Sequence, residues 1–207
     1  AGFLANKRGV DIDAIYYESP PHTSIDAKNK VISLAKELHK YGSNINLYVM
    51  PFTKIQEEIY KNIDPTYMIT IMRRMMYRIS AIIANENKCN ILVNGESIGQ
   101  VASQTLTSMR AINEVVKMPV IRPVACFDKL EIIDISKKIG TFDISTLPYE
   151  DCCTVFVPKH PVINPNGALC EEYEALIPYK ELIYKAIKEH TTIKVGIKEE
   201  NKFSDLL

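Results

Sequence analysis

The sequence has no net charge and no long hydrophobic run. Its 25 Lys and Arg residues balance 25 Asp and Glu residues, whereas proteins that bind nucleic acid by themselves depend largely on an excess of cationic side chains. The balance of charge therefore argues against this chain binding RNA without the help of another domain or protein. No window approaches the roughly 18 apolar residues of a membrane helix, and residues 1–8 become polar too soon for a signal peptide. We expect a cytoplasmic protein.

Cysteine is scarce, with five residues among 207. An odd, thinly spread set does not build a disulfide framework, so we expect reduced thiols. Cys89, Cys126 and Cys170 lack the spacing of zinc ligands, and the four histidines show no spaced pairing, so we expect no metal site made of side chains. The Gly-x-x-x-x-Gly-Lys and Gly-x-Gly-x-x-Gly nucleotide motifs are absent as well.

The remaining pattern predicts an α/β fold. The length suits one large domain, and the hydrophobic content of 46% is ordinary for a globular protein. Strand-like runs alternate with helical ones, which predicts a parallel sheet with helices on both faces and ligands at the carboxyl ends of the strands. The predicted strands are 11–19, 46–52, 91–93 and 120–121, and the predicted helices begin at Thr23 or Ser24, at Thr53, after Pro65, at Val101 and at Asp128.

A methionine-rich stripe marks the helix after Pro65 as part of the core. Its apolar residues recur at intervals of three and four: Met68, Met72, Met75, Met76, Ile79, Ile82 and Ile83. After residue 141 the chain is rich in helix breakers and reads as a lid or active-site loop. One last helix is predicted over 173–189. We divide the chain into a domain at 1–190 and a charged tail at 191–207 that frays toward its end.

The segment from Asn94 to Gln104 follows an apolar strand and enters a helix. Gly95 and Gly99 would let the backbone approach a ligand, and free N–H groups at the start of a helix attract anions. An anion or a nucleotide would fit. A plain turn capped by Ser97 explains the pattern equally well.

Cationic and aromatic residues near these elements are further candidates. Arg73, Arg74 and Arg78 flank the methionine stripe, where a guanidinium can donate two hydrogen bonds to a phosphate or be solvated. Tyr16 and Tyr17 end the first strand, where they border an adenine or serve only in packing.

Cys152 and Cys153 are adjacent in the breaker-rich loop. Adjacent cysteines rarely form a disulfide, whereas a loop thiol near Lys159 and His160 can ionise and act as a nucleophile. Two acidic residues just before the pair oppose that ionisation. A catalytic pair and a buried inert pair are both consistent with the residues.

Several long motifs, in a fixed order, together resemble the tRNA 4-thiouridine synthetases, sulfurtransferases shared with thiamine biosynthesis. The motifs are 19–24 (SPPHTS), 70–76 (TIMRRMM), 94–104 (NGESIGQVASQ), Arg122-Pro123 and 148–161 (PYEDCCTVFVPKHP). The resemblance covers residues 1 to about 161, and 164–174 departs from it. It implies an adenine-nucleotide α-hydrolase fold with a Rossmann-like parallel sheet. The family's Ser-Gly-Gly-x-Asp-Ser pyrophosphate loop, the strand before it and the RNA-capturing domains are expected before Ala1.

The same resemblance implies specific nucleotide contacts. ATP would be held by Tyr16, Tyr17, Arg73, Gly95 and Gln104, with Mg²⁺ on the phosphates. ATP would adenylate the C4 oxygen of a tRNA uridine and release pyrophosphate. Sulfur from a cysteine persulfide would then replace AMP.

The resemblance places that persulfide on Cys152 or Cys153 without choosing between them. The implied partners are tRNA, a cysteine desulfurase or another persulfide donor, and a thiamine sulfur-carrier protein. Exposed strand edges would also favour a homodimer. Two other hypotheses remain: an ATP-pyrophosphatase-fold synthetase or thiolase with another acceptor, and a non-catalytic binding domain.

Overall fold

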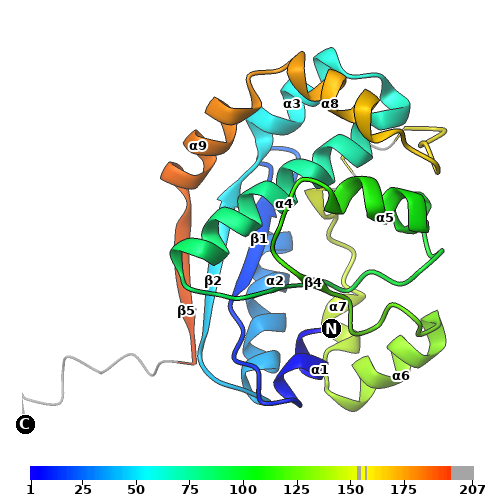
Figure 1. Ribbon diagram of the computed structural model, residues 1–207. Helices are drawn as coiled ribbons and strands as arrows, with labels where there is room; N and C mark the ends of the chain where they lie inside the picture. Colours follow the sequence, from blue (N-terminus) through cyan, green and yellow to red (C-terminus); the bar gives the residue numbers. More distant parts are fainter. Residues whose placement is uncertain (153–154, 157, 197–207) are drawn as a thin grey trace, which may run out of the picture.

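Two strand ladders form the centre of the computed structural model, which describes residues 1–152, 155–156 and 158–196. The first ladder has the order β1-β2-β5, with bounds Ala14–Glu18, Ile45–Pro51 and Thr191–Val195 (Figure 1). The second pairs β3 (Leu92–Val93) with β4 (Val120–Ile121). The pairs β1-β2 and β3-β4 are parallel, which confirms the predicted α/β class, and β5 runs antiparallel to β2.

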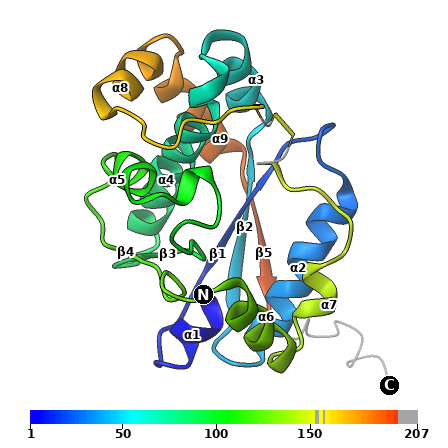
Figure 2. The ribbon, with the colours of Figure 1, turned by 90° about the vertical axis from the view of Figure 1, so that its right-hand side faces the viewer.

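Helices cover both faces of the first ladder, as Figure 2 shows. Helix α2 contacts all three of its strands on one face, and α9 contacts β2 on the other, where it also packs on α3 and α4. The described helices are α1 (Gly2–Asn6), α2 (Ile25–His39), α3 (Thr53–Asn62), α4 (Met68–Glu86), α5 (Leu106–Asn113), α6 (Lys129–Lys138), α7 (Phe142–Ser145), α8 (Gly167–Ala175) and α9 (Tyr179–Glu189), with 3₁₀ turns η1 (Pro65–Tyr67) and η2 (Ala102–Gln104).

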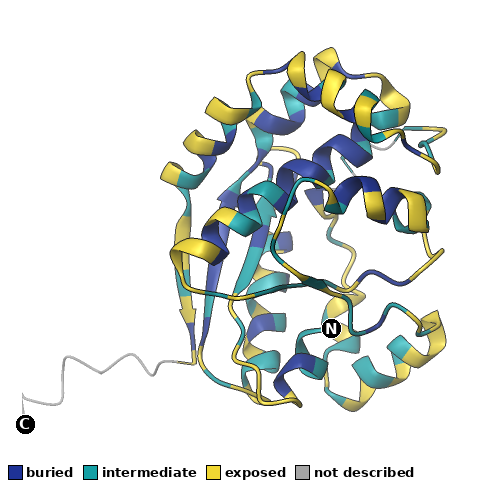
Figure 3. Cartoon of the chain, viewed as in Figure 1, coloured by how far each residue is buried: buried dark blue, intermediate teal, exposed yellow. Residues whose placement is uncertain are grey.

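The side chains of β2 alternate between these two helical layers. Leu47 and Val49 pack toward α2, while Tyr48 and Met50 belong to the core on the face of α4. This follows from the period of two in a strand, which sends successive side chains to opposite faces. Figure 3 accordingly shows β2 and the middle of α4 as the buried centre of the molecule.

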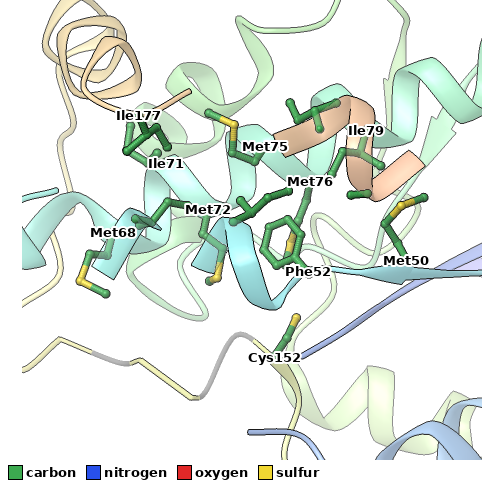
Figure 4. Close-up of a cluster of buried hydrophobic side chains, with 14 of the residues drawn as sticks. Met50, Phe52, Met68, Ile71, Met72, Met75, Met76, Ile79, Cys152 and Ile177 are labelled. Atoms are coloured by element: carbon green, nitrogen blue, oxygen red, sulfur yellow. The ribbon is translucent and has the colours of Figure 1, made fainter. Parts of the chain in front are cut away.

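The methionine stripe of α4 packs in that centre (Figure 4). Its predicted members are buried except Ile82, which is 37% exposed. Helix α4 has 19 residues and carries three arginines, and no helix in the described ranges is long and apolar enough to cross a membrane.

Two predicted helix starts are confirmed by their caps. The Ser24 side chain accepts a hydrogen bond from the Ala27 amide, and Asp128 and Glu131 form a reciprocal capping box. Helix α6 ends before Gly140, whose φ of 75° belongs to the left-handed region that glycine adopts without strain.

Three predictions about the remaining elements are wrong. The helix predicted over 173–189 is two helices, α8 and α9, with Pro178 between them, because proline lacks the amide hydrogen that a continuous helix requires. The helix from Val101 is divided at Thr105, whose extended backbone caps α5. The tail does not begin at residue 191, because Thr191–Val195 pairs with β2. Residues 197–207 lie outside the described residues.

Candidate functional site

The predicted glycine turn follows β3 directly. Gly95 is exposed, and a Cβ built on it would meet only the Ala1 Cβ, at 3.9 Å. Its two neighbours are anchored inward: the Asn94 Oδ1 accepts a hydrogen bond from the Glu96 amide at 3.2 Å, and the Glu96 side chain is buried. The backbone at Gly95 is therefore open to a ligand.

Gln104, in η2, stabilises the same turn through two hydrogen bonds. Its side-chain oxygen accepts a hydrogen bond from the Ser97 amide at 3.3 Å, and its carbonyl oxygen accepts one from the Gly99 amide at 2.9 Å. Gly99 has a φ of 79°, which a residue with a Cβ rarely adopts. Gln104 thus holds the shape of the segment that contains Gly95.

Glu96 joins this turn to α4 and to the segment after β4. One carboxylate oxygen accepts a hydrogen bond from Arg73 Nη2, and the other accepts bonds from Arg122 Nε at 2.7 Å and the Tyr77 hydroxyl at 3.0 Å. Burial alone would raise the pKa of Glu96, but the two arginines and Asn94 outweigh it and hold that pKa below its ordinary value.

This cluster of Arg73, Glu96 and Arg122 carries two positive charges and one negative charge. Its arginine side chains are 20% and 16% exposed, while the Glu96 side chain is 3% exposed. The Arg73 Nε is buried and has no hydrogen-bond partner among the described residues. An excess guanidinium that reaches the surface suits an anion, and phosphate in particular.

The two tyrosines of β1 point to opposite faces of the ladder. Tyr17 donates a hydrogen bond to the Met76 carbonyl oxygen at 2.6 Å and packs on Phe52, so its ring belongs to the core under α4. Tyr16 lies on the other side. Burial, together with the negative charge of Asp151, raises the pKa of Tyr16 to about 12.

Cys152 lies at the carboxyl end of β1. It is 5% exposed, and Figure 4 shows its side chain directed toward Phe52. Its carbonyl oxygen accepts a hydrogen bond from Gln56 Nε2 at 2.7 Å, and the Gln56 side-chain oxygen accepts one from the Ser19 hydroxyl. Gln56 therefore ties the loop to the end of β1. Cys153 lies outside the described residues.

Further contacts hold the loop on both sides of Cys152. Lys30 on α2 donates a hydrogen bond to the Tyr149 carbonyl oxygen at 2.6 Å. Beyond the cysteines, the Val162 amide donates to the Thr66 carbonyl oxygen at 2.9 Å, and Thr105 donates to the Ile163 carbonyl oxygen. The loop therefore runs from α2 past the end of β1 to the starts of α4 and α5.

The predicted site residues thus form two groups at strand ends. Arg73, Gly95 and Gln104 gather at β3, whereas Tyr17 and Cys152 belong to one core cluster at the end of β1 and Tyr16 packs on the opposite face of the ladder. Sequence reasoning missed Glu96, Tyr77 and the role of Arg122 as functional candidates. The available signal was a carboxylate inside the glycine-rich segment, which needs a cationic partner if it is buried.

One pocket borders the cluster of Arg73, Glu96 and Arg122: a hollow of about 560 Å³ has Ile98 and Arg122 among its lining residues. In the part of the chain that the structure describes, no three His, Cys, Asp or Glu side chains converge on a metal site. Another pocket, of about 750 Å³, lies between α4 and α9, where Arg78, Cys89 and Tyr179 are among its lining residues.

Comparison with known proteins identifies the family. The family model for the thiamine biosynthesis protein (ThiI) matches residues 1–178. The chain belongs to the ThiI family. A probable tRNA sulfurtransferase of Oceanobacillus iheyensis is 46% identical over 209 residues, covering 100% of this chain and 52% of that protein. The resemblance seen in the sequence motifs is therefore confirmed. The prediction that it ends near residue 161 is wrong, because the matched region extends to residue 178 and includes 164–174.

A solved structure extends the similarity to the fold of this ThiI-family chain. The crystal structure of a 4-thiouridine synthetase in complex with RNA and with bound ATP superimposes with a TM-score of 0.88 at 37% identity. The match covers 94% of this chain and 51% of that one. The chain spans about half the length of the relatives it matches.

Proposed function

We propose that this chain is the ATP-using catalytic domain of a tRNA sulfurtransferase that converts a tRNA uridine to 4-thiouridine. The observation that carries the proposal is that the Gly95 turn with its two arginines and the Cys152 loop both lie at carboxyl ends of strands, where ligands of α/β sheets bind. The names of the similar sulfurtransferase and synthetase support the reaction type. The proposed domain spans residues 1–190, and β5 adds a strand to it.

The residues proposed to hold ATP are Tyr16, Tyr17, Arg73, Gly95 and Gln104. The open space at Gly95 and the buried Nε of Arg73, which has no partner in the described ranges, fit a phosphate-bearing ligand. Gln104 maintains the turn, and Tyr17 contributes through its backbone because its hydroxyl is bonded to α4. ATP supplies the adenylyl group that turns a uridine oxygen into a leaving group.

The proposed sulfur transfer follows that activation. The C4 oxygen of uridine attacks the α-phosphorus, and pyrophosphate leaves. The terminal sulfur of a persulfide on Cys152 or Cys153 then attacks C4, and AMP leaves with the oxygen. A second thiol then loses its proton and attacks the Sγ of that cysteine: a disulfide forms between them, the S–S bond to the transferred sulfur breaks, and 4-thiouridine is released.

The remaining parts of the proposal concern partners and setting. Because the described residues offer no cluster of three metal-ligating side chains, Mg²⁺ is proposed to arrive on the ATP phosphates, which this ion commonly uses as ligands. The proposed partners are tRNA, a cysteine desulfurase or another persulfide donor, a thiamine sulfur-carrier protein, through which sulfur would reach the thiazole of thiamine, and a second copy of the chain. The proposed compartment is the cytoplasm.

Replacing both loop cysteines tests the proposal. The full-length protein with tRNA, ATP and a persulfide donor should form 4-thiouridine, and Cys152→Ser with Cys153→Ser should reduce its formation to background. Pyrophosphate release should persist in that double variant, because activation of uridine precedes sulfur transfer. The control is Cys89→Ser, since Cys89 follows the carboxyl end of α4, whereas the cysteine loop reaches the residues just before the start of that helix.

Three outcomes, from this assay, from a substrate screen and from calorimetry, would contradict the proposal. Thiolation that survives in the double variant would remove the sulfur role from the loop. Adenylation of a small acid but not of tRNA would indicate a synthetase of the same fold. Calorimetry that detects no ATP binding by the full-length protein would indicate a non-catalytic binding domain.

A further inference from the structure

Glu96 lies in the Gly95 turn and contacts the Arg73 side chain, and so it joins the proposed ATP-binding residues at the end of β3. We propose that Glu96 is a positioning residue: its carboxylate fixes the Arg73 guanidinium and the Gly95 turn in one arrangement, and ATP affinity depends on it through Arg73. This inference rests on the proposed function. It adds to that function a residue that does not itself need to touch the nucleotide.

The two carboxylate oxygens of Glu96 accept hydrogen bonds from different donors. One accepts a hydrogen bond from Arg73 Nη2. The other accepts bonds from Arg122 Nε at 2.7 Å and Asn94 Nδ2 at 2.8 Å. Asn94 and Glu96 flank Gly95, so the residues on both sides of the exposed peptide are anchored to one buried group.

The negative charge is essential to this arrangement. Glutamine has nearly the same size, but its side chain is neutral, and its NH₂ group donates where the carboxylate accepts. With glutamine at position 96, Arg73 and Arg122 would face one another across a neutral side chain. Repulsion between them would move the more exposed Arg73 away from the turn.

A second buried carboxylate on α8 provides a matched control. Glu174 is as buried as Glu96 and also accepts hydrogen bonds from two arginines of α4, Arg74 and Arg78. None of its hydrogen bonds in the described part of the chain reaches the Gly95 turn. Glu174→Gln therefore removes a similar buried charge without disturbing the proposed nucleotide site.

The experiment is calorimetric titration of ATP into the full-length protein and its folded variants. Glu96→Gln should weaken binding by about tenfold to hundredfold, the range expected when a charged hydrogen bond is lost. Arg73→Lys should lose a similar factor, because lysine cannot reproduce the guanidinium geometry. The double variant should be no weaker than the weaker single variant, since both changes disable one interaction. Glu174→Gln should stay within about twofold of the unmodified protein, because it leaves that interaction intact.

The outcomes separate this inference from the proposed function. The inference is overturned if Glu96→Gln binds ATP as tightly as the unmodified protein. It is also overturned if the loss of ATP affinity in the double variant equals the product of the two single-variant losses. If Glu96→Gln does not fold, Glu96→Asp keeps the charge but is one methylene too short to reach all partners, and unchanged ATP affinity in that variant overturns the inference equally. Failure of the unmodified protein to bind ATP contradicts the proposed function itself.

Discussion

Two neighbouring arginines of α4 belong to clusters of similar chemistry and different surroundings. Arg73 contacts Glu96 at the end of β3, and Arg74 contacts Glu174 on α8. Consecutive helical residues are about 100° apart around the axis, so they face different partners. The Arg74 side chain is 1% exposed, whereas that of Arg73 is 20% exposed. An arginine–glutamate pair is therefore fully buried on one side of α4, and we call it the closed cluster. On the other side, the pair with Arg73 reaches the surface, and we call it the open cluster.

The closed cluster holds three helices together. Arg74 donates two parallel hydrogen bonds to Glu174, at 2.7 and 3.1 Å, and a third to the Ala111 carbonyl oxygen at 2.6 Å. These bonds join α8 and α5 to α4. They leave that guanidinium little capacity for a ligand, which distinguishes it from Arg73.

Replacing Arg74 should have the largest effect on stability. Arg74→Met removes the arginine and leaves the more exposed Arg78 as the one ion-pair partner of buried Glu174 among the described residues. Losing one partner of a buried ion pair costs about 3–5 kcal/mol. Denaturant unfolding followed by circular dichroism measures this loss.

The surface pair on α5 is the control for this measurement. Arg110 is 84% exposed and contacts Glu114 at 3.3 Å. Arg110→Met should change the unfolding free energy by less than about 1 kcal/mol. A loss of similar size in both variants would mean that Arg74 is not the closed partner described above.

Acid should affect the open cluster in a specific pH range. The folded-state pKa of Glu96 lies below its ordinary value of 4.5, so its ionised form stabilises the fold at higher pH. That contribution should be lost as the pH falls from the unfolded-state pKa through the lower folded-state pKa. The stability difference between the unmodified protein and Glu96→Gln should therefore narrow below about pH 4.5.

Unfolding curves for these two proteins at several pH values from neutral to strongly acidic check this smaller effect. A difference that remains constant on acidification would contradict the low pKa of Glu96. The arginines stay charged throughout this range, so a change in slope can be assigned to the carboxylate.

Local sequence predicted those elements whose signal lies within one segment. The apolar runs of β1 and β2, the caps at Ser24 and Asp128 and the methionine stripe all act over a few residues. Strand β5 was missed because Thr191–Val195 has exposed residues at both of its first two positions and pairs with a strand far away in the chain. Its position is set by tertiary contact rather than by local pattern.

Single residues of the site could be predicted from the sequence, but the contacts between them could not. Gly95 and Arg73 stood out as ligand-binding residue types, and their roles remain predictions. The carboxylate that joins them could not be assigned, because positions 73, 96 and 122 meet only after α4, β3 and β4 have packed. A sequence pattern reports spacing along the chain, and this cluster depends on spacing across the fold.

The most direct test of the account is a crystal structure of the full-length protein with a non-hydrolysable ATP analogue. The account predicts that the phosphates lie against the Gly95 backbone with Arg73 in contact and Glu96 still bonded to that arginine. A nucleotide bound instead in the pocket between α4 and α9, beside Arg78 and Tyr179, would contradict it.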